Sequence, residues 1–229
     1  MPREINITID EARALVADRA LWPLVRDFLW DFAPQVHGSW LEGLGREGES
    51  ASSHVSSLMS SPRVKRFVLS ELGVAPCFHA FPKEDWSRLV LLDGVTLESI
   101  AKWLGALACA DSLRRVTGGA TVRELKATLP GIYPEVFAFT EYFGKWKIEN
   151  VECKMEGSTI CKLGGQVLFA VLKDLPEAVL RRLELKLPKD IQVRDVESFG
   201  NFSFSIFNSQ FIAKLLKLRF PEAYKICCL

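Results

Sequence analysis

The sequence contains one pattern with the spacing of a phosphate-binding loop, Gly43-Leu-Gly-Arg-Glu-Gly48. In nucleotide-binding proteins such glycines follow a buried strand and open a helix, whose N-terminal N–H groups meet the phosphate. Here Trp40-Leu-Glu42 precedes the glycines, and Glu49 follows with an acid where phosphate would be repelled. We therefore interpret the segment as a flexible linker and expect the protein to bind no nucleotide or other cofactor.

Histidine and cysteine are not spaced as metal ligands or catalytic residues. Metal centres need convergent ligands, commonly found in short patterns such as CxxC or HExxH. Cys153 and Cys161 have no CxxC partner, and a C-terminal prenylation box would need its cysteine at Ile226, not at Cys227 or Cys228. The histidines, which match no ligand spacing, are His37, His54 and His79. Since no GxSxG or defensible Ser/His/Asp pattern is present either, we predict no metal site, no catalytic residue and no enzyme activity.

Clusters of positive charge are the remaining candidates for a site. The adjacent pairs are Arg114-Arg115 and Arg181-Arg182, and a third cluster lies near the C-terminus. Such cations can solubilise a helix face or complement a helix C-terminus, and they can also bind an acidic partner. Two adjacent arginines exceed what a helix C-terminus needs. We predict that an acidic partner binds Arg114 and Arg115, joined by Arg123, with the second candidate cluster being Lys214, Lys217 and Arg219.

The length, composition and net charge of the chain exclude several classes of protein. A chain of 229 residues, 48% hydrophobic and 25% charged, has the composition of a globular protein. A net charge of +1 argues against a general nucleic-acid binder. The N-terminal segment lacks the apolar core of a signal peptide, and no apolar run approaches the roughly 20 residues that span a bilayer. We therefore expect a cytosolic protein with its six cysteines reduced and no direct membrane insertion.

Apolar spacing predicts helices through most of the chain. Thr8–Glu11 matches a capping box, and Pro23 either kinks the helix that follows or begins a second one. The clearest helix is predicted to start with Thr96 as N-cap and Glu98 in the first turn. Its small residues, between 101 and 110, leave room for another helix to approach closely. Its apolar stripe is Leu97, Ile100, Ala101, Leu104 and Leu107 or Ala108.

We accordingly predict a mostly α, compact helical domain, with any strands confined to Trp146–Gly157 or Leu183–Val196. The second range alternates with period two over Leu183-Glu-Leu-Lys-Leu187. Composition shifts to Gly, Ser and Glu from His37 to Ser61, which predicts a loop or linker. The predicted segments are a helical N-terminus at 1–36, the linker at 37–61 and a main helical domain at 62–229. Further helices are predicted at Pro62–Gly73, Lys83–Asp93, Thr121–Leu129, Pro134–Tyr142, Ser158–Lys173, Pro176–Lys186 and Ser203–Arg219.

The order of features from about Trp86 onward resembles the YscK/SctK-type family of type III secretion proteins. Leu89–Asp93 is followed by a small-residue helix and Ser112-Leu-Arg-Arg115, and a later segment closes at Pro130-Gly131. Further on, Arg181-Arg-Leu-Glu-Leu-Lys-Leu-Pro188 resembles the family's Leu-rich segment, and Ile212-Ala-Lys-Leu-Leu-Lys217 its closing helix. These motifs are leucine patterns, and within the first third only Leu21-Trp-Pro-Leu24 aligns.

The resemblance implies a non-enzymatic adaptor of the bacterial injectisome sorting platform. Such an adaptor links the forkhead-like cytoplasmic domain of the inner-membrane ring protein to the pod-forming C-ring-like protein, which in turn holds the stator and the export ATPase. It implies a place in the bacterial cytoplasm, peripheral to the inner membrane through protein partners. Two alternatives stay open: a helical enzyme with a site assembled from scattered polar residues, and a chaperone or regulator that binds an exported helix.

Overall fold

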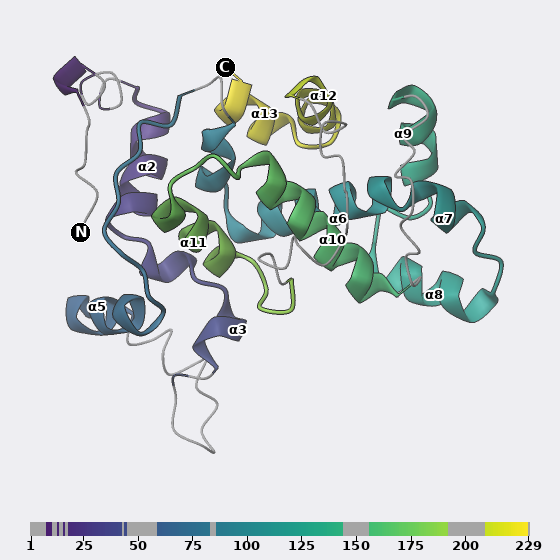
Figure 1. The fold of residues 1–229 in the computed structure, drawn as a ribbon, viewed down its shortest axis with the longest axis horizontal. Coiled ribbons are helices and arrows are strands. Elements are labelled where there is room, and N and C mark those ends of the chain that lie inside the picture. Colours follow the sequence, from purple (N-terminus) through teal and green to yellow (C-terminus); the bar gives the residue numbers. More distant parts are fainter. Residues whose placement is uncertain are drawn as a thin grey trace. The chain divides into compact units, whose positions relative to one another are not determined.

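The structure, a computed structural model, is built from helices, as predicted, and no strand occurs among the residues it describes (Figure 1). Those residues are 8–10, 13, 16, 18–42, 44, 59–82, 86–143, 156–191 and 209–228. The chain forms two compact units, each assembled from segments that are distant in sequence. The division predicted from composition, into 1–36, 37–61 and 62–229, is a different one and stays a prediction.

Unit 1 comprises Met1–Gly94, Asp174–Lys189 and Glu222–Leu229. Its described helices are α2 (Leu21–Leu29), the 3₁₀ turn η1 (Ala33–Gln35), α3 (Gly38–Leu41), α5 (Pro62–Glu71), the 3₁₀ turn η2 (Ser87–Leu91), α11 (Glu177–Lys186) and nearly all of α13 (Pro221–Cys228).

Unit 2 comprises Val95–Lys173 and Asp190–Pro221. Its described helices are α6 (Gly94–Ala108, whose first residue counts with unit 1), α7 (Ala110–Arg114), α8 (Gly119–Thr128), α9 (Val136–Phe143), α10 (Gly157–Val171) and α12 (Ser209–Arg219).

Helix α6 forms the centre of unit 2, and its predicted apolar stripe from Leu97 to Leu107 is buried. The expected close approach of a second helix is confirmed, and that helix is α10, which Figure 1 shows beside α6. A Cβ built on Gly164 would overlap the carbonyl oxygen of Ala101, and one on Gly105 would overlap the carbonyl oxygen of Ile160. The two backbones therefore meet where neither helix carries a side chain.

The start of α6 differs from the prediction, because the helix begins at Gly94 and Thr96 lies in its first turn instead of at the N-cap. The reason is a tertiary contact: a Cβ on Gly94 would lie 2.7 Å from the carbonyl oxygen of Lys186, so the chain turns into the helix at its smallest residue. The helix predicted for Lys83–Asp93 is a 3₁₀ turn over Ser87–Leu91 in the described part of that range.

The strand alternative for Leu183–Leu187 is wrong, since this segment belongs to helix α11 and its C-terminal cap. The alternation of apolar and charged residues misleads because Glu184 and Lys186 are buried together with their leucine neighbours. The helix stripe is instead Val179, Arg182, Leu183 and Lys186, at positions i, i+3, i+4 and i+7. The other strand range lies largely outside the described residues, and its last residue, Gly157, opens α10.

Near the N-terminus, Pro23 lies in the first turn of a new helix, one of the two outcomes expected of it. The Asp18 carboxylate accepts hydrogen bonds from the backbone N–H groups of Ala20 and Leu21, which caps α2. Within the predicted linker, Gly38–Leu41 is helical and packs in unit 1, where the Trp40 indole N–H donates to the carbonyl of Leu187 (2.9 Å).

Candidate functional site

The predicted partner-binding arginines on α7 and α8 differ in how they are used. Arg114 is exposed, yet its guanidinium donates to the Thr140 hydroxyl (2.6 Å) and to the Phe137 carbonyl (3.3 Å), and it lies over the Phe137 ring. It therefore joins α7 to α9. Arg115 and Arg123 are exposed, and neither makes an ion pair or side-chain hydrogen bond with a described residue. These two guanidinium groups are the ones available to an acidic partner.

The second predicted cluster, on α12, is divided in the same way. Lys214 and Lys217 are exposed, beside Leu218, which is 50% exposed. Arg219 instead turns inward, pairs with the Glu135 carboxylate, and stacks on the ring of Trp103. It lies three and four residues after the buried Leu216 and Leu215, so helical spacing alone already places Arg219 at the edge of the apolar stripe.

Three cations of α11 are buried or partly buried instead of solubilising a surface, which corrects the expectation for Arg181-Arg182. Arg182 is 2% exposed and donates to the Ala75 carbonyl (2.8 Å) and the Cys77 sulfur (2.7 Å). Arg181 donates to the Leu72 carbonyl (3.0 Å). Lys186, 1% exposed, donates to two carbonyls of the segment at η2. These side chains hold irregular segments of unit 1 against the helix, because each satisfies carbonyls that no helix or sheet would satisfy.

The electrostatics of Lys186 give unit 1 a pH-sensitive residue. Its ammonium donates to the carbonyls of Val90 (2.8 Å) and Leu92 (2.9 Å) and lies 4.9 Å from the centre of the Phe28 ring. Burial lowers the pKa of Lys186 to about 7, against the opposing effect of Asp93. Below pH 7 the Lys186 side chain is therefore charged although it is buried, and burial disfavours the charged form.

We expect the stability of the protein to rise with pH above neutrality because of Lys186. The folded pKa lies below the unfolded value of 10.5, so between these values the unfolded chain binds the extra proton and raising the pH favours folding. The expected contribution of Lys186 from pH 7 to pH 8.5 is a gain of about 1.5 kcal/mol in the free energy of unfolding. Urea unfolding of the wild type and of Lys186→Met across this range measures it.

The gain should be absent from Lys186→Met, and a variant whose stability changes with pH in parallel with the wild type would contradict the assignment. Burial also raises the pKa of four thiols, those of Cys77, Cys161, Cys227 and Cys228. These thiols keep their protons in the folded state and begin to titrate in the unfolded chain within this pH range, so their contribution has the opposite sign and is present in both proteins. The Lys186 contribution is therefore the difference between the wild type and Lys186→Met.

The groups weighed for metal or covalent chemistry are dispersed. In the part of the chain that the structure describes, no three His, Cys, Asp or Glu residues are placed to hold a metal ion. Cys109 and Cys161 are both buried in the core. Cys227 and Cys228 belong to α13, and Cys227 is buried. The residues outside the described ranges include Gly43, the segment 45–50, His54 and Cys153.

The arrangement therefore defines an all-helical protein, in its described residues, whose candidate sites are exposed basic faces. A family model described as YOP proteins translocation protein K (YscK) matches residues 31–218. The chain thus belongs to the YscK family and is a type III secretion protein, as the resemblance indicated. No curated protein and no solved structure matches it. Among its described helices, none has both the length and the apolar character to cross a membrane.

Proposed function

We propose that this protein is a non-enzymatic adaptor of the injectisome, linking the cytoplasmic domain of the inner-membrane ring protein to the pod-forming C-ring-like protein. Through the pod it would connect indirectly to the stator and the export ATPase. It would act in the bacterial cytoplasm, held at the inner membrane by its protein partners, without binding nucleic acid. Membership of the YscK family supports the secretion role.

The observation that carries the proposal is the contrast between two kinds of cation in unit 2. Arg114 and Arg219 stabilise the fold. Arg114 joins α7 to Thr140 of α9, and Arg219 joins α12 to Glu135, the residue just before α9. Arg115 and Arg123 extend from the same helical body without a described partner. Arginine suits a protein interface, since its planar group pairs bidentately with carboxylates and loses comparatively little hydration. An adaptor needs such a face on a stiff helical body, and no reactive centre.

Reversing the two exposed arginines tests the proposal. Titration of the ring protein's cytoplasmic domain should show about tenfold weaker binding for Arg115→Glu/Arg123→Glu at low salt. The difference should shrink as salt rises, since screening acts over about 10 Å at 0.1 M. Arg114→Glu/Arg115→Glu is harder to interpret, because replacing Arg114 also removes the hydrogen bonds that join α7 to α9.

The matched control is Lys162→Glu/Lys173→Glu, which makes the same change in net charge at two exposed lysines outside α7 and α8. If both double variants weaken binding equally, net charge alone causes the effect and this face is not the binding site. Unchanged affinity in a folded Arg115→Glu/Arg123→Glu protein would remove this face from the interface and direct attention to Lys214, Lys217 and Arg219. If neither platform partner binds but an exported helical peptide does, the chaperone alternative would gain support.

A further inference from the structure

Two tryptophans form an aromatic pair in unit 1: Trp22 in α2, which is half-buried, and Trp30 at the C-cap of that helix, which is exposed. Trp22 and Trp30 lie two helical turns apart, and their ring centroids are 5.7 Å from each other. Trp30 ends the helix and is 60% exposed. Exposed single apolar residues are ordinary, but tryptophan is the residue type most enriched among the side chains that dominate binding energy at interfaces.

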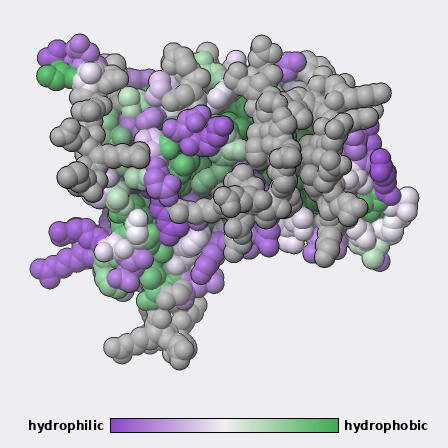
Figure 2. Space-filling model, in the orientation of Figure 1, coloured by the Kyte–Doolittle hydropathy of each residue, from purple (hydrophilic) through white to green (hydrophobic). Residues whose placement is uncertain are grey.

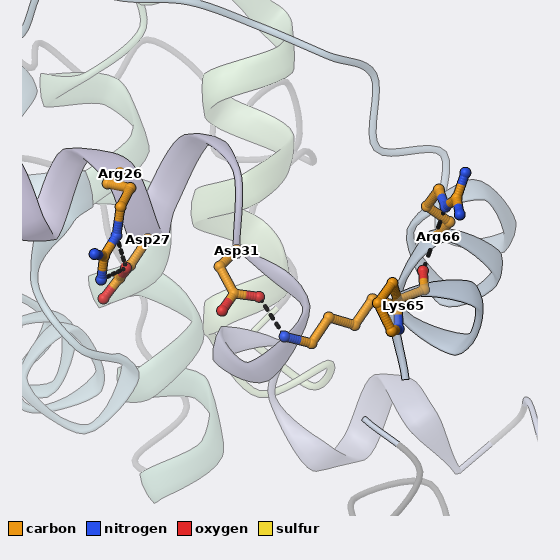
Figure 3. A network of polar contacts seen from close by, with 6 residues as sticks. Arg26, Asp27, Asp31, Lys65 and Arg66 are labelled. Atoms are coloured by element: carbon orange, nitrogen blue, oxygen red, sulfur yellow. Dashed lines mark hydrogen bonds and ion pairs between the residues drawn. The ribbon is translucent and has the colours of Figure 1, made fainter. Parts of the chain in front are cut away.

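Charged residues close to Trp30 in the sequence form two ion pairs, which Figure 3 draws. Arg26, between the two tryptophans in sequence, pairs with Asp27 (2.7 Å). Asp31, the residue after Trp30, pairs with Lys65 of α5 (2.6 Å). The second pair fixes α5 beside the end of α2, and the two pairs leave no net charge on these four residues. This is the arrangement of a polar rim around an aromatic centre.

The charge that remains comes from α5 and is positive on balance, because Arg63 and Arg66 outnumber Glu71, which is exposed at the end of the helix. Val68 and Leu72 face the core, so the opposite side of α5 presents Arg63, Arg66 and Phe67 to solvent. Phe67 is 56% exposed. Neither arginine forms an ion pair with a described residue, and the Arg66 guanidinium donates to the Pro62 carbonyl of its own helix (3.4 Å). In Figure 2 hydrophilic side chains project over α5, beside hydrophobic surface.

We propose that the α2–α5 surface (Trp22, Trp30, Arg63, Arg66 and Phe67) docks an acidic segment of a protein partner that also carries an apolar side chain. The apolar side chain packs on Trp30, and the carboxylates pair with Arg63 and Arg66. Charge complementarity selects this occupant: on the solvent side of α5 the two guanidinium groups outnumber the one exposed carboxylate, that of Glu71, and guanidinium groups match carboxylates in geometry and sign.

An anionic membrane fits the same surface less well. Recognition of acidic lipids generally uses clusters of four to eight Lys or Arg residues. Here the acids Asp27 and Asp31 lie around Trp30, where they would meet the lipid headgroups. A partner segment can instead place its carboxylates at α5 alone and its apolar side chain at Trp30. The inference is independent of the proposed function, because it concerns unit 1 whereas the ring-protein titration uses variants of unit 2.

The test uses the full chain and a fluorescein-labelled helical peptide of about 16 residues with leucines on one face flanked by glutamates. Anisotropy titration should show binding that weakens about tenfold in Trp30→Ala and in Arg63→Glu/Arg66→Glu. A blue shift of tryptophan fluorescence, absent in Trp30→Ala, should accompany binding. Leu218→Ala, at a comparably exposed apolar position, and Lys126→Glu/Lys162→Glu are the matched controls, and both should bind as the wild type does.

Several results would overturn the proposal. One is no binding at about millimolar peptide, and another is equal binding of a peptide in which lysines replace the glutamates. Equal weakening by the control variants would show that net charge or apolar area alone matters. Tighter binding to phosphatidylserine vesicles would favour a membrane, and a Trp30-dependent dimer in light scattering would favour a second copy of this chain. Because Arg63 and Arg66 are exposed, their variant tests the proposal even if Trp30→Ala fails to fold.

Discussion

Replacing Gly164 with alanine is expected to lower the free energy of unfolding by about 3 kcal/mol. The added methyl group would overlap the carbonyl oxygen of Ala101 and lie 2.6 Å from its carbonyl carbon, both backbone atoms of α6. Backbone cannot rotate away as a side chain can, so α6 and α10 would have to separate along a buried contact. The added helix propensity of alanine, about 0.5–1 kcal/mol, opposes this loss but is smaller. Chemical unfolding followed by circular dichroism gives the value.

The matched control is Gly119→Ala, at the start of α8, where a Cβ would meet no atom within 4 Å. That variant should be neutral or slightly more stable than the wild type. Gly105→Ala, on the other side of the crossing, should be destabilised like Gly164→Ala, since its Cβ would overlap the Ile160 carbonyl. A Gly164→Ala protein as stable as Gly119→Ala would show that the helices do not approach as closely as described.

Removing the side chain of Arg182 should have a comparable effect in unit 1, also about 3 kcal/mol. Arg182→Ala would take the donor away from the Ala75 carbonyl and the Cys77 sulfur, and it would leave a space beside the Phe32 ring, over which the guanidinium lies. Burial lowers the pKa of Arg182, opposed by Cys77, but arginine at neutral pH stays charged, so the loss is that of a charge-assisted donor. Urea unfolding measures the change.

A local measurement distinguishes this contact from general destabilisation. Burial raises the pKa of the Cys77 thiol and the Arg182 charge lowers it, so rates of reaction with a thiol reagent are compared per thiolate. If Arg182 holds the chain near Cys77, that rate should rise at Cys77 in Arg182→Ala, whereas the buried Cys161 of unit 2 should react as before. Arg123→Ala, at an exposed arginine, should change stability by less than about 0.5 kcal/mol. Equal acceleration at Cys77 and Cys161 would contradict the assigned role.

The helices of unit 2 show how much of this fold can be predicted from sequence. The period of Leu97, Ile100 and Leu104 is enough to predict a buried face, because residues three and four apart lie on one side of any α-helix. The small residues of the same helix predict a close neighbour. They do not identify α10 as that neighbour, since pairing between segments some sixty residues apart depends on which surfaces meet in the folded chain.

The basic residues illustrate the opposite case. Arg115 points to solvent while Arg114, its neighbour, binds α9, and no local pattern separates two adjacent arginines. For Arg182 and Lys186 the sequence did contain a signal of burial, because both lie on the apolar stripe of α11. The stripe alone does not show which hydrogen-bond acceptors a buried cation would find. Those acceptors, such as the carbonyls of Ala75 and Val90, lie about a hundred residues earlier in the chain.

What the sequence by itself determined is the helical class, the buried face of α6 and the family, because these depend on residue types at short, regular spacing. The tertiary structure decided where α6 begins, which cations are buried, and which remain exposed for a partner. Those outcomes depend on whether a distant backbone carbonyl or aromatic ring lies within reach of a long, flexible side chain, and local spacing carries no information about that distance.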